Sequence, residues 1–250
     1  KGLCITISGS TGSGGFMDNI TNKINALFAK AESTDSTHEA EALLAKAQEL
    51  MIKHAIDAEL LGEREDSREE VAFEDVELAT KGSPGAQALF MLLCATARAN
   101  SVTPLGTNEG WHDARLIGYP RDITSAKAMY HAIVLAMFDA ELKSRANRPR
   151  HEHARTWKVS FYNGFVHTMS TKLLQARDDA VSQANAEHGS SAELVLVSKE
   201  QRVQTWISEN MTLGRATRSA SRTRSASGFL SGVTAANTVD LRSRGSVESR

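Results

Sequence analysis

The sequence predicts a predominantly helical α+β protein, in which an N-terminal two-helix hairpin docks on a helical domain that contains a small antiparallel sheet. Three observations lead to this fold class. Apolar residues recur at helical spacing over most of the 250-residue chain. Alanine is abundant while aromatic residues make up only 6%, which favours helices. Two short β-type segments flank one polar loop, and their place between runs of helices indicates α+β.

Residues 1–16 form a leader rich in Gly, Ser and Thr, which we expect to be non-native or disordered. The leader has no basic start followed by an apolar stretch, so it does not fit a signal peptide. One hypothesis places the natural start at Met17, with a ribosome-binding AGGAGG in the codons of Ser13, Gly14 and Gly15. A nucleotide sequence without AGGAGG would remove this argument, and the alternative is a native Gly/Ser-rich tail.

Residues 17–62 are predicted to form the helical hairpin domain. The first helix runs from about Asp18 to Glu32, with apolar residues on one face. After a polar turn, Ser36 and Glu39 form a capping box that starts the second helix. Two helices joined by a short turn lie antiparallel. Because about 35 residues bury too little surface to be stable alone, we expect the hairpin to dock on the rest of the chain.

Residues 63–82 are predicted to be an acidic linker, in which Val71–Leu78 is extended or helical. The companion domain, residues 83–211, starts with a helix from Pro84 to about Asn100, with Pro84 in its first turn. This helix is apolar nearly all round, so it is predicted to be the central buried helix. The later elements are predicted as strands over Ser101–Leu105 and Ala114–Gly118, helices from Asp122 (as N-cap) to Ser144 and from Ala154 to His188, a strand over Glu193–Val197, and a short helix over Lys199–Glu209.

Residues 212–250 are predicted to contain an Arg/Ser-rich segment followed by a small-residue helix. Gly228, Gly232 and Ala236 recur every four residues there. Small residues at that spacing lie on one face and let a helix pack closely on a neighbour. The last residues carry no recognisable stop, so we expect the sequence to be truncated.

The stretch from Lys23 to Ile56, KINALFAKAESTDSTHEAEALLAKAQELMIKHAI, resembles the N-terminal domain of a family of uncharacterised bacterial and bacteriophage proteins. Four later segments are similar to the companion domain that often follows it: Leu89–Asn100, Leu116–Ile123, Trp157–Gly164 and Leu194–Val197. The likeness covers most of Asp18 to Leu241. It implies a lineage and a fold, and it brings no catalytic residues to carry over.

The formal net charge of −1 conceals segregated charge. Glu32 to Glu77 contains fifteen acids and four bases, whereas Lys143 to Arg177 contains eight bases and the single acid Glu152. The eight bases form what we call the basic band: Lys143, Arg145, Arg148, Arg150, Arg155, Lys158, Lys172 and Arg177. The basic band is predicted to bind phosphates of DNA or RNA, and the alternative is pairing with acidic segments of the same fold. Trp157 and Tyr162 lie within it, either exposed and able to stack on bases or, for Trp157, in the core.

Histidines are the candidates for a metal-assisted hydrolase, which would use His112, His151, His153 or His167. The segment His151-Glu-His153 is not the zinc-protease motif HExxH, because Arg155 occupies the position of the second histidine. We therefore expect an exposed loop cluster, no metal site and no cofactor.

Two further interpretations concern histidines near apolar residues. His112 and Asp113 form either an acid–base pair or part of a turn beside Trp111. His131 and His167 are expected to be half-buried on their helices.

The sequence contains no GxxxxGK[ST] loop, no GxGxxG after a strand and no GxSxG elbow. The two cysteines, Cys4 and Cys94, form no zinc or disulfide pattern, which fits a reducing cytoplasm. No apolar run reaches the roughly 18 residues of a membrane span. We predict a cytoplasmic, non-enzymatic module that binds nucleic acid or a host or phage protein. The alternatives are the hydrolase and an adaptor that docks through the acidic stretch Glu32–Glu77.

Overall fold

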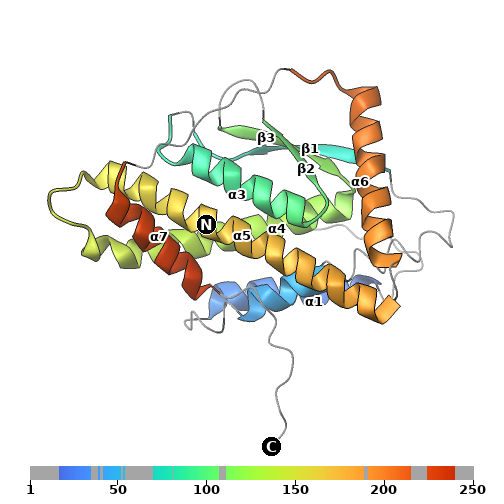
Figure 1. Ribbon diagram of the computed structural model, residues 1–250, viewed down its shortest axis with the longest axis horizontal. Coiled ribbons are helices and arrows are strands. Elements are labelled where there is room, and N and C mark those ends of the chain that lie inside the picture. The colour runs from blue at the N-terminus through green and yellow to red at the C-terminus, as the bar shows by residue number, and fades with distance from the viewer. Residues whose placement is uncertain are drawn as a thin grey trace, which may run out of the picture.

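The computed structural model describes residues 17–34, 39, 42–51, 53, 70–80, 82–106, 111–188, 191–214 and 224–239 (Figure 1). The fold is mostly helical with one three-stranded antiparallel sheet, which confirms the predicted fold class. In chain order the elements are α1 (Met17–Ser33), β1 (Ala72–Glu77), α3 (Ala86–Ala99), β2 (Thr103–Gly106), β3 (Asp113–Gly118), α4 (Pro120–Ser144), the 3-10 helix η1 (Arg145–Asn147), α5 (Ala154–His188), α6 (Ser191–Asn210) and α7 (Ala226–Thr238). Residues 42–51 are also helical.

The sheet has the strand order β1-β3-β2, so the last strand in sequence lies in the middle. Ala72 pairs with Gly118 at one end of the β1–β3 ladder, and Thr103 pairs with Ile117 in the β2–β3 ladder. Both predicted strands are confirmed, and the segment around β1 is extended. Asp113 to Leu116 of the central strand alternate between half-buried and buried. Ile117 and Gly118 are buried as well, because one face of the strand packs on α3 and the other on α6.

α3 is the central buried helix, as predicted. Nearly all of its side chains are buried, and it packs against α4, α5 and β2. The helix begins at Ala86, two residues after Pro84, because Gly85 is left-handed (φ 93°) and acts as N-cap. The ring of Tyr162 lies 2.6 Å from the position of a Cβ at Gly85, so a larger residue there is excluded by sterics as well.

α7 packs directly on the backbone of α5, which confirms the predicted small-residue helix. A Cβ at Gly232 would overlap the carbonyl oxygen of Phe161, and Gly164 of α5 lies equally close to the carbonyl of Phe229. Both ends of α7 are fixed. The Ser225 hydroxyl accepts from the amide of Gly228 at 2.9 Å, and the Lys172 ammonium donates to the last carbonyls, including Ala236 at 2.8 Å.

The strand predicted over Glu193–Val197 is wrong, because these residues belong to α6. Leu196, Lys199, Val203 and Ile207 are buried at helical spacing. Val203 and Ile207 pack with Ile117 and Tyr119 on the outer side of the sheet. Tertiary packing of a 20-residue amphipathic helix therefore overrides the β propensity of five residues.

A second correction concerns the start of α4. Asp122 is not the N-cap: the helix begins at Pro120 with Tyr119 as N-cap, and Asp122 lies buried in the first turn. Its carboxylate is held from outside the helix by Lys199 of α6.

The hairpin residues that the structure describes dock on the main domain. Ile24 and Phe28 of α1, with Leu44 and Met51 of the 42–51 helix, join the same hydrophobic cluster as α3, α4 and α5. α1 packs on α4. The leader 1–16, the capping residue Ser36, residues 63–69 and 81 of the acidic linker and residues 215–223 of the Arg/Ser-rich segment lie outside the described residues.

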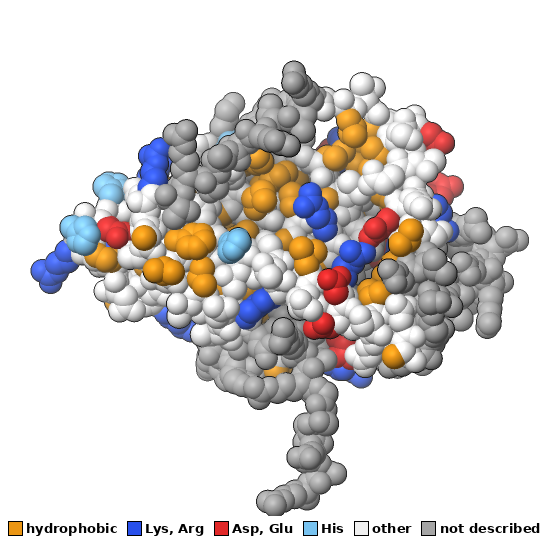
Figure 2. Space-filling model, viewed as in Figure 1, with side chains coloured by type: hydrophobic (Ala, Val, Ile, Leu, Met, Phe, Trp, Pro, Cys, Tyr) orange, Lys and Arg blue, Asp and Glu red, His pale blue; other side chains and the backbone are white. Residues whose placement is uncertain are grey.

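The connection from α4 to α5 and the start of α7 meet at one end of the molecule, on the left in Figure 1. In Figure 2 this end carries Lys or Arg side chains together with histidines. Among the described helices, none has the length and apolar character required to cross a membrane.

Candidate functional site

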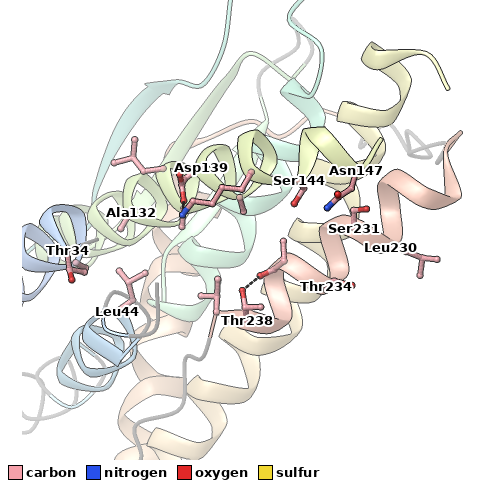
Figure 3. Close-up of a pocket in the computed structure, with 17 residues that line it drawn as sticks. Thr34, Leu44, Ala132, Asp139, Ser144, Asn147, Leu230, Ser231, Thr234 and Thr238 are labelled. Carbon is pink, nitrogen blue, oxygen red and sulfur yellow. Dashed lines mark hydrogen bonds and ion pairs between the residues drawn. The ribbon is translucent and has the colours of Figure 1, made fainter. Parts of the chain in front are cut away.

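A groove runs between α4 and α7, with the hairpin at one end, and encloses about 1000 Å³ (Figure 3). We call it the α4–α7 groove. Its lining comes from four separate parts of the chain: Ala31, Thr34, Leu44, Ala132, Leu135, Ala136, Asp139, Ala140, Lys143, Ser144, Asn147, Leu230, Ser231, Thr234, Ala235, Thr238 and Val239.

α4 supplies one wall of the groove through residues three or four positions apart. Ala132, Ala136 and Ala140 recur every four residues, so they share one face of the helix. Asp139 and Lys143 lie on the same face and form an i,i+4 ion pair of 2.7 Å. The wall is therefore lined mainly by small apolar side chains, and its two charges neutralise each other.

α7 supplies the opposite wall. One face of this helix packs on α5, and the other lines the groove. Gly228, Gly232 and Ala236 face α5 and are buried. Thr234 and Thr238 face the groove, and the hydroxyl of Thr238 donates to the carbonyl of Ala235 at 2.7 Å. Because the glycine face is in backbone contact with α5, this wall cannot move without breaking the core.

The two ends of the groove differ in polarity. Thr34 and Leu44 of the hairpin lie at one end (Figure 3). Ser144, Asn147 and Ser231 gather at the other end. The η1 end of the groove thus has three hydrogen-bonding side chains, whereas the hairpin end has the apolar Leu44 beside Thr34.

Large apolar side chains are exposed along the rim. Leu135 of α4 is 53% exposed and Leu230 of α7 is 62% exposed, and both also line the groove. Phe138 and Leu142 are exposed on α4, three and seven positions after Leu135. Large exposed apolar side chains three or four positions apart on one helix are typical of an interaction site.

The lining offers little for catalysis. Asp139 and Lys143 are the titratable groups in it, and they are paired with each other. The other polar atoms are hydroxyls and one amide, without an adjacent base in the lining. The groove can therefore supply shape, apolar contact and hydrogen bonds.

Most of the basic band is engaged in contacts within the chain. Its contacts are Lys143 with Asp139, Arg145 and Lys158 with Glu141, Arg177 with Glu200, Arg148 with the carbonyl of Glu152, and Lys172 with the end of α7. Trp157 and Tyr162 are buried, so neither ring is free to stack on a base. Along α5 the step from Arg155 to Arg177 amounts to roughly 33 Å at 1.5 Å per residue, so the band does not form one compact patch.

The predicted histidines are not brought together. His151 and His153 are exposed in the loop before α5, as expected, and no group of three residues suited to a metal ion occurs in the described part of the chain. His131 and His167 are exposed, so the expectation that they are half-buried is wrong. His112 lies in the turn before β3, where its carbonyl accepts from the amide of Leu78 at 2.7 Å.

Comparison with known proteins identifies one part of the chain. Residues 19–58 match a family model described as a protein of unknown function (DUF2786). The resemblance of the hairpin to an uncharacterised domain family is thereby confirmed, whereas the likeness to a companion domain remains a prediction. No curated protein and no solved structure matches the chain. The matched segment contributes Ala31, Thr34 and Leu44 to the groove.

Sequence reasoning missed the groove. The sequence of α4 is amphipathic, and Leu135 and Leu142 lie outside its predicted buried face. These two leucines could therefore have indicated a second apolar surface on the helix. The lining of α7 gave no such signal, because Ser, Thr and Ala on a helix are equally typical of a solvated face.

Proposed function

We propose that this protein is a non-enzymatic interaction module that binds an amphipathic helix of a partner protein in the α4–α7 groove. The observation that carries the proposal is an apolar groove of about 1000 Å³ with Leu135 and Leu230 exposed on its two rims. Grooves of this kind receive the apolar face of a helix, with anchors at i, i+3 or i+4, and i+7.

The dimensions of the groove support a helical occupant. On α4 the lining extends from Ala132 to Lys143, which corresponds to roughly 16 Å or three helical turns. The alanines along this wall allow the backbone of a third helix to approach closely, while its larger side chains fill the space between α4 and α7.

Rigidity of the walls also supports binding. α7 is held by glycine contacts with α5 and by the cap from Lys172, so the groove exists before a partner arrives. A preformed site loses less conformational entropy on binding than one that must be ordered. The hairpin, which carries the DUF2786 match, would close one end of the groove and so select occupants by length.

A groove-filling substitution tests the proposal. Helical peptides would be selected from a display library on the full chain, and the affinity of each selected peptide would be measured by fluorescence anisotropy. Ala136→Trp places a bulky ring inside the groove and should abolish binding, whereas Ala29→Trp on the exposed side of α1 should leave it unchanged. Peptides that bind both variants equally would refute the groove as the binding site.

A further inference from the structure

Five exposed basic or potentially basic side chains meet at one end of the molecule, and none of them lines the α4–α7 groove. Arg150, His151 and His153 lie in the loop between η1 and α5, Arg155 lies in the first turn of α5, and Arg224 immediately precedes the N-cap of α7. We call these five the basic tip. In Figure 2 the left end of the molecule shows Lys or Arg and His side chains close together.

Hydrogen bonds across more than 60 residues of sequence assemble the basic tip. The Glu152 carboxylate accepts from the hydroxyl of Ser225 and, at 2.8 Å, from that of Ser227. The Ser160 hydroxyl accepts from the backbone amides of Arg224 at 3.3 Å and Ser225 at 3.1 Å. These bonds hold the start of α7 against the start of α5, and they bring Arg224 beside the loop.

The same hydrogen bonds engage Glu152, the acidic residue of this region. The hydroxyls of Ser225 and then Ser227 hold the pKa of Glu152 below its usual range. Arg148 is bound to the carbonyl of Glu152 rather than to its carboxylate. Because Glu152 is engaged by α7, no carboxylate of the described chain pairs with Arg150, Arg155 or Arg224.

This distinguishes the basic tip from the rest of the basic band. The cations of the band that lie outside the loop and the first turn of α5 have ion-pair or capping partners, whereas Arg150 and Arg155 are exposed and have no carboxylate partner among the described residues. Counting Arg148, Arg150, Arg155 and Arg224 against Glu152 gives a local charge of +3, before any proton on the two histidines.

We propose that the basic tip binds the sugar–phosphate backbone of a nucleic acid, as a function separate from the groove. Guanidinium groups form bidentate hydrogen bonds with phosphate oxygens, and several of them at fixed spacing match a chain of phosphates. Among the described residues 148–155 and 224–229, no large apolar side chain is exposed. The exposed Leu230 of the next turn lines the α4–α7 groove, so the residues of the tip itself supply no apolar anchor of the kind that a peripheral membrane site uses.

Fluorescence anisotropy of short labelled single- and double-stranded oligonucleotides with the full chain tests this proposal. Removing two phosphate contacts should weaken binding at low salt by about tenfold or more and lower the slope of log K against log salt by about 2. The variant is Arg150→Glu with Arg155→Glu. Its matched control is Lys23→Glu with Arg98→Glu, which changes the net charge equally at two exposed sites and should alter the affinity by less than about twofold. Arg224→Glu alone should reduce affinity in the same direction.

Three results would overturn the proposal: no binding at low salt, equal weakening by the tip variant and its control, or tighter binding to phosphatidylserine vesicles than to oligonucleotides. Circular dichroism of both double variants establishes that each is folded. Because the groove variant Ala136→Trp leaves the tip intact, it should retain oligonucleotide affinity, so failure of the groove proposal and failure of this one are distinguishable.

Discussion

Lys199 of α6 and Asp122 of α4 form a buried ion pair with an N–O distance of 2.5 Å. Their side chains are only 5% and 9% exposed. The Lys199 ammonium also lies 5.0 Å from the centre of the Tyr119 ring, at the end of the sheet. The pair therefore connects the outer helix to the first turn of α4, beside the apolar contacts of Val203 and Ile207.

Lys199→Met should destabilise the fold by about 3–5 kcal/mol, because it leaves the Asp122 charge buried without its cation. The double variant with Asp122→Leu should recover most of this loss, since two apolar residues need no compensating charge. Urea unfolding of the wild type, both single variants and the double variant gives the coupling free energy. Single-variant costs that simply add would show that the pair contributes no coupling.

Gly232→Ala should destabilise the protein even though alanine favours helices by about 1 kcal/mol over glycine. The new Cβ would overlap the Phe161 carbonyl and lie 2.8 Å from the Phe165 nitrogen, both of which are backbone atoms that cannot rotate away. We expect a net loss of about 1–3 kcal/mol. Ser231→Ala, on the groove side of the same helix, is the control and should be neutral or slightly stabilising. A stabilised Gly232→Ala protein in thermal unfolding would contradict the backbone contact.

Gln48→Met should stabilise the protein by about 1–2 kcal/mol, because the substitution removes an unpaired amide from the core. Gln48 is fully buried in the 42–51 helix, and neither of its amide atoms has a hydrogen-bond partner in the part of the chain that the structure describes. Methionine has nearly the same length and no polar group to desolvate. Chemical denaturation compares the two proteins, and Lys46→Met at an exposed position of the same helix controls for the helix propensity of methionine. A loss of stability in Gln48→Met would show that the amide is satisfied in solution.

The free energy of unfolding should fall as the pH rises from about 9 to about 11. Burial raises the pKa of the Cys94 thiol from 9.0 to about 11, so the unfolded chain ionises first. The stabilisation is fully present below the unfolded pKa and is lost on approaching the folded one, with a total of about 2–3 kcal/mol. Burial also raises the pKa of Tyr130 and Tyr162, which acts in the same direction.

Cys94→Ala separates the thiol from the tyrosines in that experiment. Denaturant unfolding at several pH values should give a shallower decline for the variant than for the wild type. Parallel declines over the whole range would show that the thiol does not contribute.

Elements whose residue pattern along the sequence is strong were predicted correctly. α3 is apolar on nearly all sides, so its side chains leave water only when the helix is surrounded by the rest of the protein, and the helix is central. The two segments around the 106–113 loop alternate and pair as expected. In α7, glycines at every fourth position indicated close packing, and the contact with Phe161 confirms it.

The errors arise where local and long-range preferences disagree. Residues 193–197 have β propensity, yet burial of Leu196, Lys199, Val203 and Ile207 requires a helix that continues to Asn210. Asp122 looked like a cap because Asp is common there, but its partner is a lysine 77 positions later in the sequence. A single sequence does not reveal such a partner.

The candidate groove could not be predicted for a related reason. Its walls come from segments about 100 residues apart, and no single segment carries an unusual motif. The basic band was visible as a count of charges. The engagement of Glu152 by Ser225 and Ser227, which keeps this carboxylate from pairing with Arg150 or Arg155, depends on how α7 docks.

The close contact between α5 and α7 also joins two helices that are made at different times during synthesis. Lys172 and Ala236 are 64 positions apart, so the face of α5 that contains Gly164 stays uncovered during synthesis until α7 has been made. Closing so long a loop slows folding and prolongs exposure of apolar surface. A chain interrupted before α7 would leave the α5 backbone at Trp157 and Phe161 uncovered, so we expect proteases to cleave it faster than a chain that contains α7.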